Sequence, residues 1–160
     1  MDVYFPAFDN QSQRALIFYV HGGGFSGGSR NEPGIQTYCK KLARHGYVVS
    51  SISYRLTREG TASAFGCDCP ALDKLNTFND AVEDLQDATF FMIKYREKMG
   101  INPQKIILSG SSARAETVLN PVNTKLLTSV PNEKIALSFF YFPFIFVAEK
   151  DFSFFFKDLE

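Results

Sequence analysis

The feature that most constrains the fold of this chain is a run of glycines directly after an apolar stretch. Ala15 to Val20 consists almost wholly of strand-forming residues, and His21-Gly22-Gly23-Gly24-Phe25 follows it. Glycine is unfavourable in a strand interior, so the strand is expected to end there in a flexible backbone loop. In α/β folds the loops at the carboxyl edge of the sheet carry the functional sites. The exposed N–H groups of this loop are therefore candidates for holding an oxyanion.

A second apolar stretch, Lys105-Ile106-Ile107-Leu108, runs into Ser109-Gly110-Ser111-Ser112-Ala113. A strand that ends in small residues and serine is typical of a strand-to-helix turn that presents a nucleophilic serine. Ser112, with Gly110 as the small residue two positions before it, is one candidate nucleophile. Ser111, flanked by Ser109 and Ala113, is the alternative.

The stretches around these two motifs predict alternating strands and helices. Strands are expected at residues 2–5, 15–20 (the central strand), 47–54 and 105–109, and helices from Pro33 to Gly46 and from an N-cap at Thr77 to Gly100, with a loop over residues 57–76. These lengths suit right-handed βαβ units with parallel strands. The acidic residues at the start of the second helix are expected to form a solvated face, with a paired-carboxylate site as the alternative; they are Asp80, Glu83, Asp84 and Asp87.

Composition excludes several classes of protein. The 160 residues, 45% of them hydrophobic, suit one globular domain, and 17 basic side chains balance 17 acidic ones, so neither nucleic acid nor an anionic membrane is an expected partner. No signal peptide is visible at the first residues, which makes the cytoplasm the default compartment. Three cysteines, Cys39, Cys67 and Cys69, make neither a disulfide framework nor a closed zinc site, and no metal or other cofactor is expected. Cys67 and Cys69 are interpreted as two thiols on a loop, with a disulfide ring between them or a soft-metal site as the alternatives.

The glycine run and the serine turn together resemble the α/β-hydrolase superfamily, in its esterase and lipase branch with the HGGG motif (hormone-sensitive-lipase-like or feruloyl-esterase-like). The resemblance implies an α/β fold with a mostly parallel sheet flanked by helices, and a serine hydrolase acting on small carboxylic esters. It implies Ser112 as nucleophile, with the N–H groups of Gly23, Gly24 and Ala113 as the oxyanion hole. His21, Gly22 and Gly110 would be structural residues of the motifs.

The sequence also departs from that family. Arg114 stands where the serine turn has glycine, and no histidine follows Ser112, although the family's order is serine, acid, histidine. The acid would be Glu149, Asp151 or Asp158, and His45 precedes a strand at the opposite edge of the sheet. Catalysis is therefore expected to be impaired. The alternatives are a non-catalytic homologue that binds a small ligand, or a truncated product without function.

Residues 121–160 do not resemble the family, so residues 1–120 are interpreted as the N-terminal part of an α/β-hydrolase domain whose C-terminal part is missing. Pro121 would break the helix after the serine turn, and nine of the 17 phenylalanines fall within residues 139–156. This Phe-rich segment is too short, and too interrupted by Pro143, to span a membrane. A buried strand, an interfacial anchor and translation in another reading frame are the interpretations left open. An incomplete sheet would also expose an edge for self-association.

Overall fold

The computed structural model describes residues 1–7, 11–111, 135–141 and 144–147, the last two ranges as backbone. In chain order the elements are β1 (Asp2–Tyr4), β2 (Arg14–Val20), α1 (Pro33–Arg44), β3 (Val48–Ile52), α2 (Ala71–Lys94), α3 (Arg96–Met99), β4 (Ile101–Gly110), β5 (Ile135–Tyr141) and β6 (Phe144–Val147). The alternation of strand and helix confirms the α/β class predicted from the sequence.

The strands form one mixed sheet in the order β1-β3-β2-β4-β5-β6. Strands β3, β2, β4 and β5 are parallel, whereas β1 and β6 pair antiparallel at the two ends. β2 pairs with β3 on one side and β4 on the other, so the prediction that residues 15–20 form a central strand is confirmed. Two strands of the Phe-rich segment, β5 and β6, extend this sheet, in agreement with the strand interpretation of its backbone.

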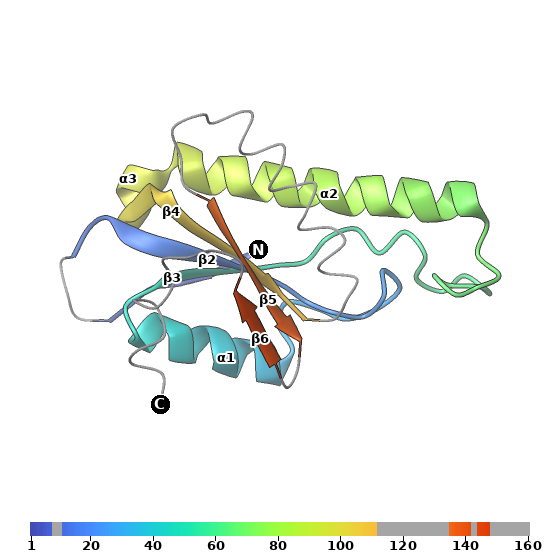
Figure 1. Ribbon diagram of the computed structural model, residues 1–160, viewed down its shortest axis with the longest axis horizontal. Coiled ribbons are helices and arrows are strands. Elements are labelled where there is room, and N and C mark those ends of the chain that lie inside the picture. The colour runs from blue at the N-terminus through green and yellow to red at the C-terminus, as the bar shows by residue number, and fades with distance from the viewer. Residues whose placement is uncertain (8–10, 112–134, 142–143, 148–160) are drawn as a thin grey trace.

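The helices lie on opposite faces of the sheet, α1 on one and α2 on the other (Figure 1). Because side chains alternate along a strand, β2 supplies both faces. Leu16, Phe18 and Val20 belong to the cluster that packs against α2, whereas Ile17 and Tyr19 belong to the cluster under α1.

Helix α1 begins where the sequence predicted, with Pro33 in its first turn and Glu32 as the N-cap. Proline suits that position because it has no N–H to satisfy and its φ is already helical. The residues at helical spacing on its apolar face are buried; they are Ile35, Cys39, Leu42 and Ala43.

Helix α2 begins at Ala71, so the prediction of an N-cap at Thr77 and a loop to residue 76 is wrong. Pro70 occupies the N-cap with an extended backbone, and the extra turns place Thr77 inside the helix. Thr77 is 1% exposed, and its Oγ1 lies 2.9 Å from Thr57 Oγ1. A threonine that is buried through a tertiary hydrogen bond has the same sequence signature as a cap, which explains the error.

The sequence predicted that the acidic residues of α2 form a solvated face, but three of them form ion pairs. Arg55, which follows β3, forms ion pairs with Asp84 at 2.9 Å, Asp80 at 3.1 Å and Glu83 at 3.1 Å. The Arg55 backbone N–H also donates to Asp84 Oδ2 at 2.7 Å. These contacts fasten the segment after β3 to the helix.

Strand β4 starts at Ile101, earlier than the predicted Lys105. Ile101 pairs with Arg14 of β2, and a register shift then precedes the pairing of Ile106 with Leu16. This irregularity accommodates Pro103, which cannot donate to a regular ladder.

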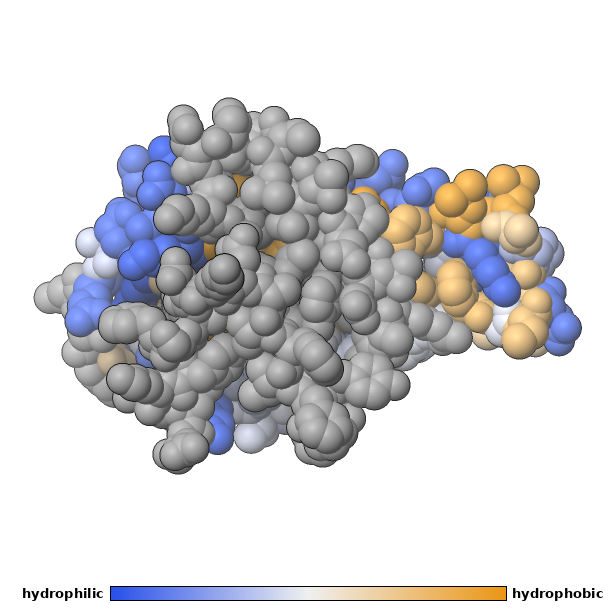
Figure 2. Space-filling model, in the orientation of Figure 1, coloured by the Kyte–Doolittle hydropathy of each residue, from blue (hydrophilic) through white to orange (hydrophobic). Residues whose placement is uncertain are grey.

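Apolar side chains gather at the end of the molecule where α2 begins (right in Figure 2), and Leu72 and Leu75 there are 67% and 54% exposed. Among the described residues, no helix combines the length and apolar character that crossing a bilayer requires.

Candidate functional site

The two motifs singled out in the sequence lie side by side at the carboxyl edge of the sheet. β2 and β4 are parallel neighbours, and Val20 pairs with Gly110. Beyond that pair, the Ser111 N–H donates to the Val20 carbonyl at 3.1 Å. The end of β4, where the serine turn begins, is thereby fixed directly beside the start of residues 21–28, called here the glycine loop.

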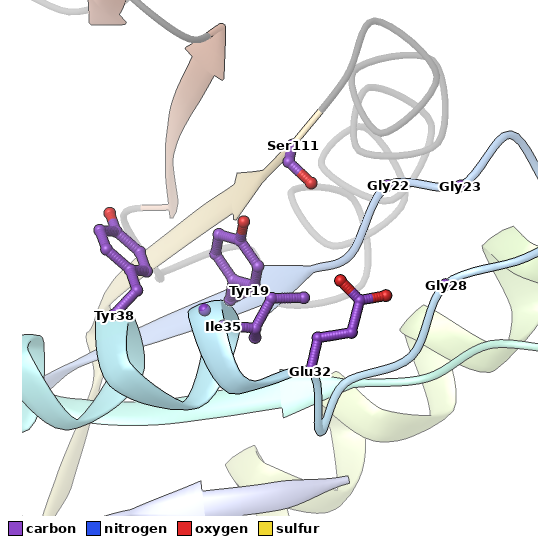
Figure 3. A pocket seen from close by; sticks show the side chains of 9 residues that line it. Tyr19, Gly22, Gly23, Gly28, Glu32, Ile35, Tyr38 and Ser111 are labelled. Carbon is purple, nitrogen blue, oxygen red and sulfur yellow. The ribbon is translucent and has the colours of Figure 1, made fainter.

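A pocket of about 510 Å³ opens between the glycine loop, the end of β4 and the first turns of α1 (Figure 3). The described residues that line it are Tyr19, Gly22, Gly23, Gly28, Glu32, Gly34, Ile35, Tyr38 and Ser111. Its size suits a small organic ligand. Two predicted site residues, Gly22 and Gly23, line it, whereas Gly110 is buried one position before Ser111.

The glycine loop has an unusual backbone. Gly23, Gly24 and Phe25 all have positive φ, at 115°, 65° and 63°. A side chain on Gly23 would collide with the carbonyl of Gly27, so only glycine fits there. Phe25 is strained in this conformation, and it is held by burial, being 2% exposed. Within the described part of the chain, the N–H groups of Gly23 and Gly24 donate to no protein acceptor.

His21 is turned into the protein, being 1% exposed. Its Nδ1 lies 2.6 Å from the Gly22 carbonyl oxygen. Because a carbonyl can only accept, Nδ1 carries the proton in this contact. His21 Nε2 is buried and has no hydrogen-bond partner among the described residues.

The sequence reasoning missed Tyr54, which packs on His21. The two rings are stacked, with centroids 4.7 Å apart and planes inclined by 11°, and the Tyr54 hydroxyl donates to the His21 carbonyl at 3.4 Å. Tyr54 also contacts Phe25 edge-on at 5.8 Å. A signal was present in the sequence, because an aromatic residue that ends a parallel strand next to β2 must lie near the same sheet edge.

Glu32 and two tyrosines of the pocket were also missed as site residues. Glu32 Oε1 accepts a hydrogen bond from the Ser29 N–H at 3.0 Å, and its carboxylate points into the space between the glycine loop and Ile35 (Figure 3). The Tyr19 hydroxyl is hydrogen-bonded to Ser111. Burial raises the pKa of Tyr19 and of Tyr38 above the usual phenol value, so both stay neutral at physiological pH.

Several predicted site residues lie outside the described residues. They are Ser112 and Ala113, together with Arg114 and the candidate acids Glu149, Asp151 and Asp158. His45 is described, and it forms the C-cap of α1, in the turn that leads to β3.

Cys39, Cys67 and Cys69 are free thiols, and burial raises the pKa of Cys39 to about 11. Among the described residues, no group of three or more His, Cys, Asp or Glu side chains is placed to hold a metal ion.

Comparisons with known proteins identify esterases as relatives of this chain. The family model described as BD-FAE matches residues 1–72. Gut esterase 1 of Caenorhabditis elegans is 30% identical over 103 residues, which are 64% of this chain and 17% of that protein. Arylacetamide deacetylase of Oryctolagus cuniculus is 31% identical over 114 residues, 69% of this chain and 25% of that protein. This chain thus spans a quarter or less of these curated relatives.

Solved structures show the same fold. The apo form of Thermogutta terrifontis esterase 2 superposes with a TM-score of 0.55 at 25% identity, covering 72% of this chain and 38% of that one. The same esterase with propionate bound superposes with a TM-score of 0.54, covering 37% of that chain. The likeness in sequence to esterases and the likeness in fold lead to one conclusion: this chain has part of the α/β-hydrolase fold and is similar in sequence to carboxylesterases of that superfamily.

Proposed function

We propose that the pocket at the carboxyl edge of β2 and β4 binds a small carboxylic ester and that Ser112 attacks its carbonyl carbon. The observation that carries this proposal is the position of Ser111, which lines the same pocket as Gly22 and Gly23. Ser112 is the next residue in the sequence, and this adjacency supports its assignment to the same site. The Thermogutta esterase has been solved with propionate and with butyrate bound, which makes short acyl esters the first substrates to test.

The oxyanion of the tetrahedral intermediate would be held by the backbone N–H groups of Gly23, Gly24 and Ala113. An oxyanion hole needs donors that are oriented before the reaction and not engaged elsewhere. The N–H groups of Gly23 and Gly24 donate to no acceptor in the described part of the chain, and the positive φ angles fix their orientation. Both observations support these two residues in this role.

In the acylation step, the Ser112 Oγ forms a bond to the acyl carbon, the serine hydroxyl loses its proton, and the alcohol leaves with a proton. A family member gives the proton to a histidine that follows the serine in the chain. The 160 residues hold only His21 and His45, both upstream, and His21 is occupied by the Gly22 carbonyl. We therefore expect slow acylation by esters with good leaving groups, followed by much slower turnover. Residual rates of about 10³–10⁴ over water remain when triad members are removed from intact hydrolases.

The test is covalent labelling of the purified chain with a fluorophosphonate, followed by mass spectrometry. We expect labelling that Ser112→Ala abolishes and Ser111→Ala retains. The matched pair separates the two serines, because each variant removes one hydroxyl from the same turn. Labelling that is lost only in Ser111→Ala would instead assign the nucleophile to Ser111.

A second candidate function, binding of a small carboxylate without catalysis, is favoured by the absence of a histidine after Ser112. If the folded wild-type chain resists the fluorophosphonate but binds butyrate in isothermal titration calorimetry, binding replaces hydrolysis as the function. If it is labelled and Ser112→Ala is not, hydrolysis stands.

A further inference from the structure

We propose that Tyr54 is a positioning residue of the oxyanion hole: through His21 it fixes the peptide unit that aims the Gly23 N–H. This inference rests on the proposed ester chemistry for its purpose, but its geometry is independent of that chemistry. It concerns the face of the glycine loop that lies away from the pocket.

The first step concerns the peptide bond between Gly22 and Gly23. A trans peptide is planar and places its C=O and N–H on opposite sides. The Gly22 carbonyl is held on the inner side by His21 Nδ1 at 2.6 Å. The Gly23 N–H must therefore point away from the imidazole. Because Gly22 and Gly23 line the pocket, the outer side of this peptide is the pocket side.

The second step concerns what holds the imidazole. Its Nδ1 can keep this bond only while the ring plane is fixed, and the ring has no other described hydrogen bond, since Nε2 is unpartnered among the described residues. The parallel stack with Tyr54 restricts rotation of the ring, and the Tyr54 hydroxyl restrains the His21 backbone through its carbonyl. Tyr54 thus restrains both the side chain and the main chain of His21.

The third step concerns the rigidity of Tyr54 itself. Tyr54 is 7% exposed and belongs to the apolar cluster under α2. The next residue, Arg55, is fastened to α2 by its ion pairs and by its backbone bond to Asp84. Tyr54 also contacts Phe25 on the far side of the glycines. The three consecutive glycines are therefore flanked by two residues that both contact one side chain anchored to the core.

The test compares Tyr54→Phe, which removes only the hydroxyl, with Tyr54→Leu, which removes the stack but keeps an apolar side chain. Tyr95→Phe and Tyr95→Leu are the matched controls, because Tyr95 lies at the C-terminal end of α2, at the opposite edge of the sheet. The phosphoryl oxygen of a fluorophosphonate imitates the oxyanion, so the maximal labelling rate depends on the N–H donors of the oxyanion hole. The fluorophosphonate concentration that gives half of this rate depends instead on how tightly the probe binds in the pocket.

We expect the maximal labelling rate to fall about two- to fivefold in Tyr54→Phe and about ten- to hundredfold in Tyr54→Leu, with little change in half-saturation; loss of a whole donor costs about 10²–10³. The Tyr95 variants should match the wild type. Equal falls in the Tyr95 and Tyr54 variants, or an effect confined to half-saturation, would overturn the proposal.

A second measurement, of the His21 tautomer, does not depend on reaction with the fluorophosphonate. Nitrogen-15 NMR of the histidine rings should show His21 protonated on Nδ1 in the wild type and in Tyr54→Phe, and should show loss of that single tautomer in Tyr54→Leu. If Tyr54→Leu fails to fold, the labelling rate of Tyr54→Phe decides, and a rate equal to the wild type overturns the proposal. If the wild type is not labelled, the ester chemistry fails, and the tautomer alone decides whether Tyr54 positions the loop.

Discussion

The two faces of the sheet are built for different tasks. The face under α2 is closed, with side chains such as Phe18, Leu85 and Met92 at 2% exposure or less. The face under α1 is smaller and ends, at the carboxyl edge, in the pocket with Tyr19, Glu32 and Tyr38. Neighbouring residues of one strand thus serve the core and the site, because strand side chains alternate.

The glycine loop lies where these two faces meet. Its inner side rests on His21 and Tyr54, which belong with the α2 face, and its outer side lines the pocket of the α1 face. Packing on the closed α2 face therefore sets the geometry of the glycine loop, which lines the pocket on the α1 face. The following predictions test this contrast, beginning with the largest expected effect.

The two faces should differ in what a truncated side chain costs. Leu85→Ala removes a side chain that is 1% exposed from the α2 face, and we expect a loss of about 3–4 kcal/mol in the free energy of unfolding. Ile35→Ala lies at the margin of the pocket on the α1 face, where solvent can fill the space, and should cost about 2 kcal/mol. Urea unfolding followed by circular dichroism measures both. Equal losses would remove the distinction between the faces.

The glycine loop should tolerate no side chain where it approaches His21. A Cβ at Gly28 would lie 2.7 Å from His21 Nδ1 and collide with the Gly22 carbonyl, at a φ of 85°. Gly28→Ala should therefore cost roughly 1–3 kcal/mol of stability. The control is Gly34→Ala in α1, where a Cβ meets nothing within 4 Å and alanine should stabilise the helix by up to about 1 kcal/mol. Thermal melts of both variants should shift in opposite directions; a destabilised Gly34→Ala would contradict this.

The α1 face should lose stability at alkaline pH through Cys39. Its pKa is raised from 9.0 to about 11 by burial, so between these values the unfolded chain has released the thiol proton and the folded chain has kept it. Stability contributed by the neutral thiol is complete below pH 9 and is lost as the pH rises toward 11. From pH 7.5 to pH 10 the loss amounts to roughly 1.4 kcal/mol.

Urea unfolding at both pH values measures this loss. Cys39→Ala is the control because it removes the thiol but keeps every tyrosine, and the raised pKa values of Tyr19 and Tyr38 also affect stability at alkaline pH. In the variant the decrease in stability between the two pH values should be smaller by about 1.4 kcal/mol. An unchanged decrease would mean that Cys39 does not titrate differently in the folded chain.

The smallest effect concerns the charge of the pocket. Glu32 should repel esters that carry a second carboxylate, and near a surface this repulsion is worth up to about 1 kcal/mol. Glu32→Gln should raise the labelling or hydrolysis rate of a hemisuccinate ester up to about fivefold relative to the matching butyrate ester. The ratio of the two rates in wild type and variant measures it. A ratio that does not change would place the substrate away from Glu32.

Much of the fold could be predicted from the sequence alone. The apolar runs defined β2, β3 and half of β4, Pro33 marked the start of α1, and the glycines after Val20 marked the loop at the sheet edge. These predictions succeed because they depend on local backbone preferences and on side-chain periodicity, which a sequence displays directly. The resemblance to the α/β hydrolases rested on the residues of the glycine run and of the serine turn.

Other features depended on contacts between distant residues. The start of α2 was missed because Thr77 is satisfied by Thr57, and the acidic face was misjudged because Arg55 binds it. The stack of Tyr54 on His21 joins residues that follow two neighbouring strands, β3 and β2. Only the tertiary structure brings such partners together, since hydrogen bonds, ion pairs and ring stacks across the chain have no local signature. The sequence by itself determined which backbone can form the loop, and the packed α2 face decided how that loop is held.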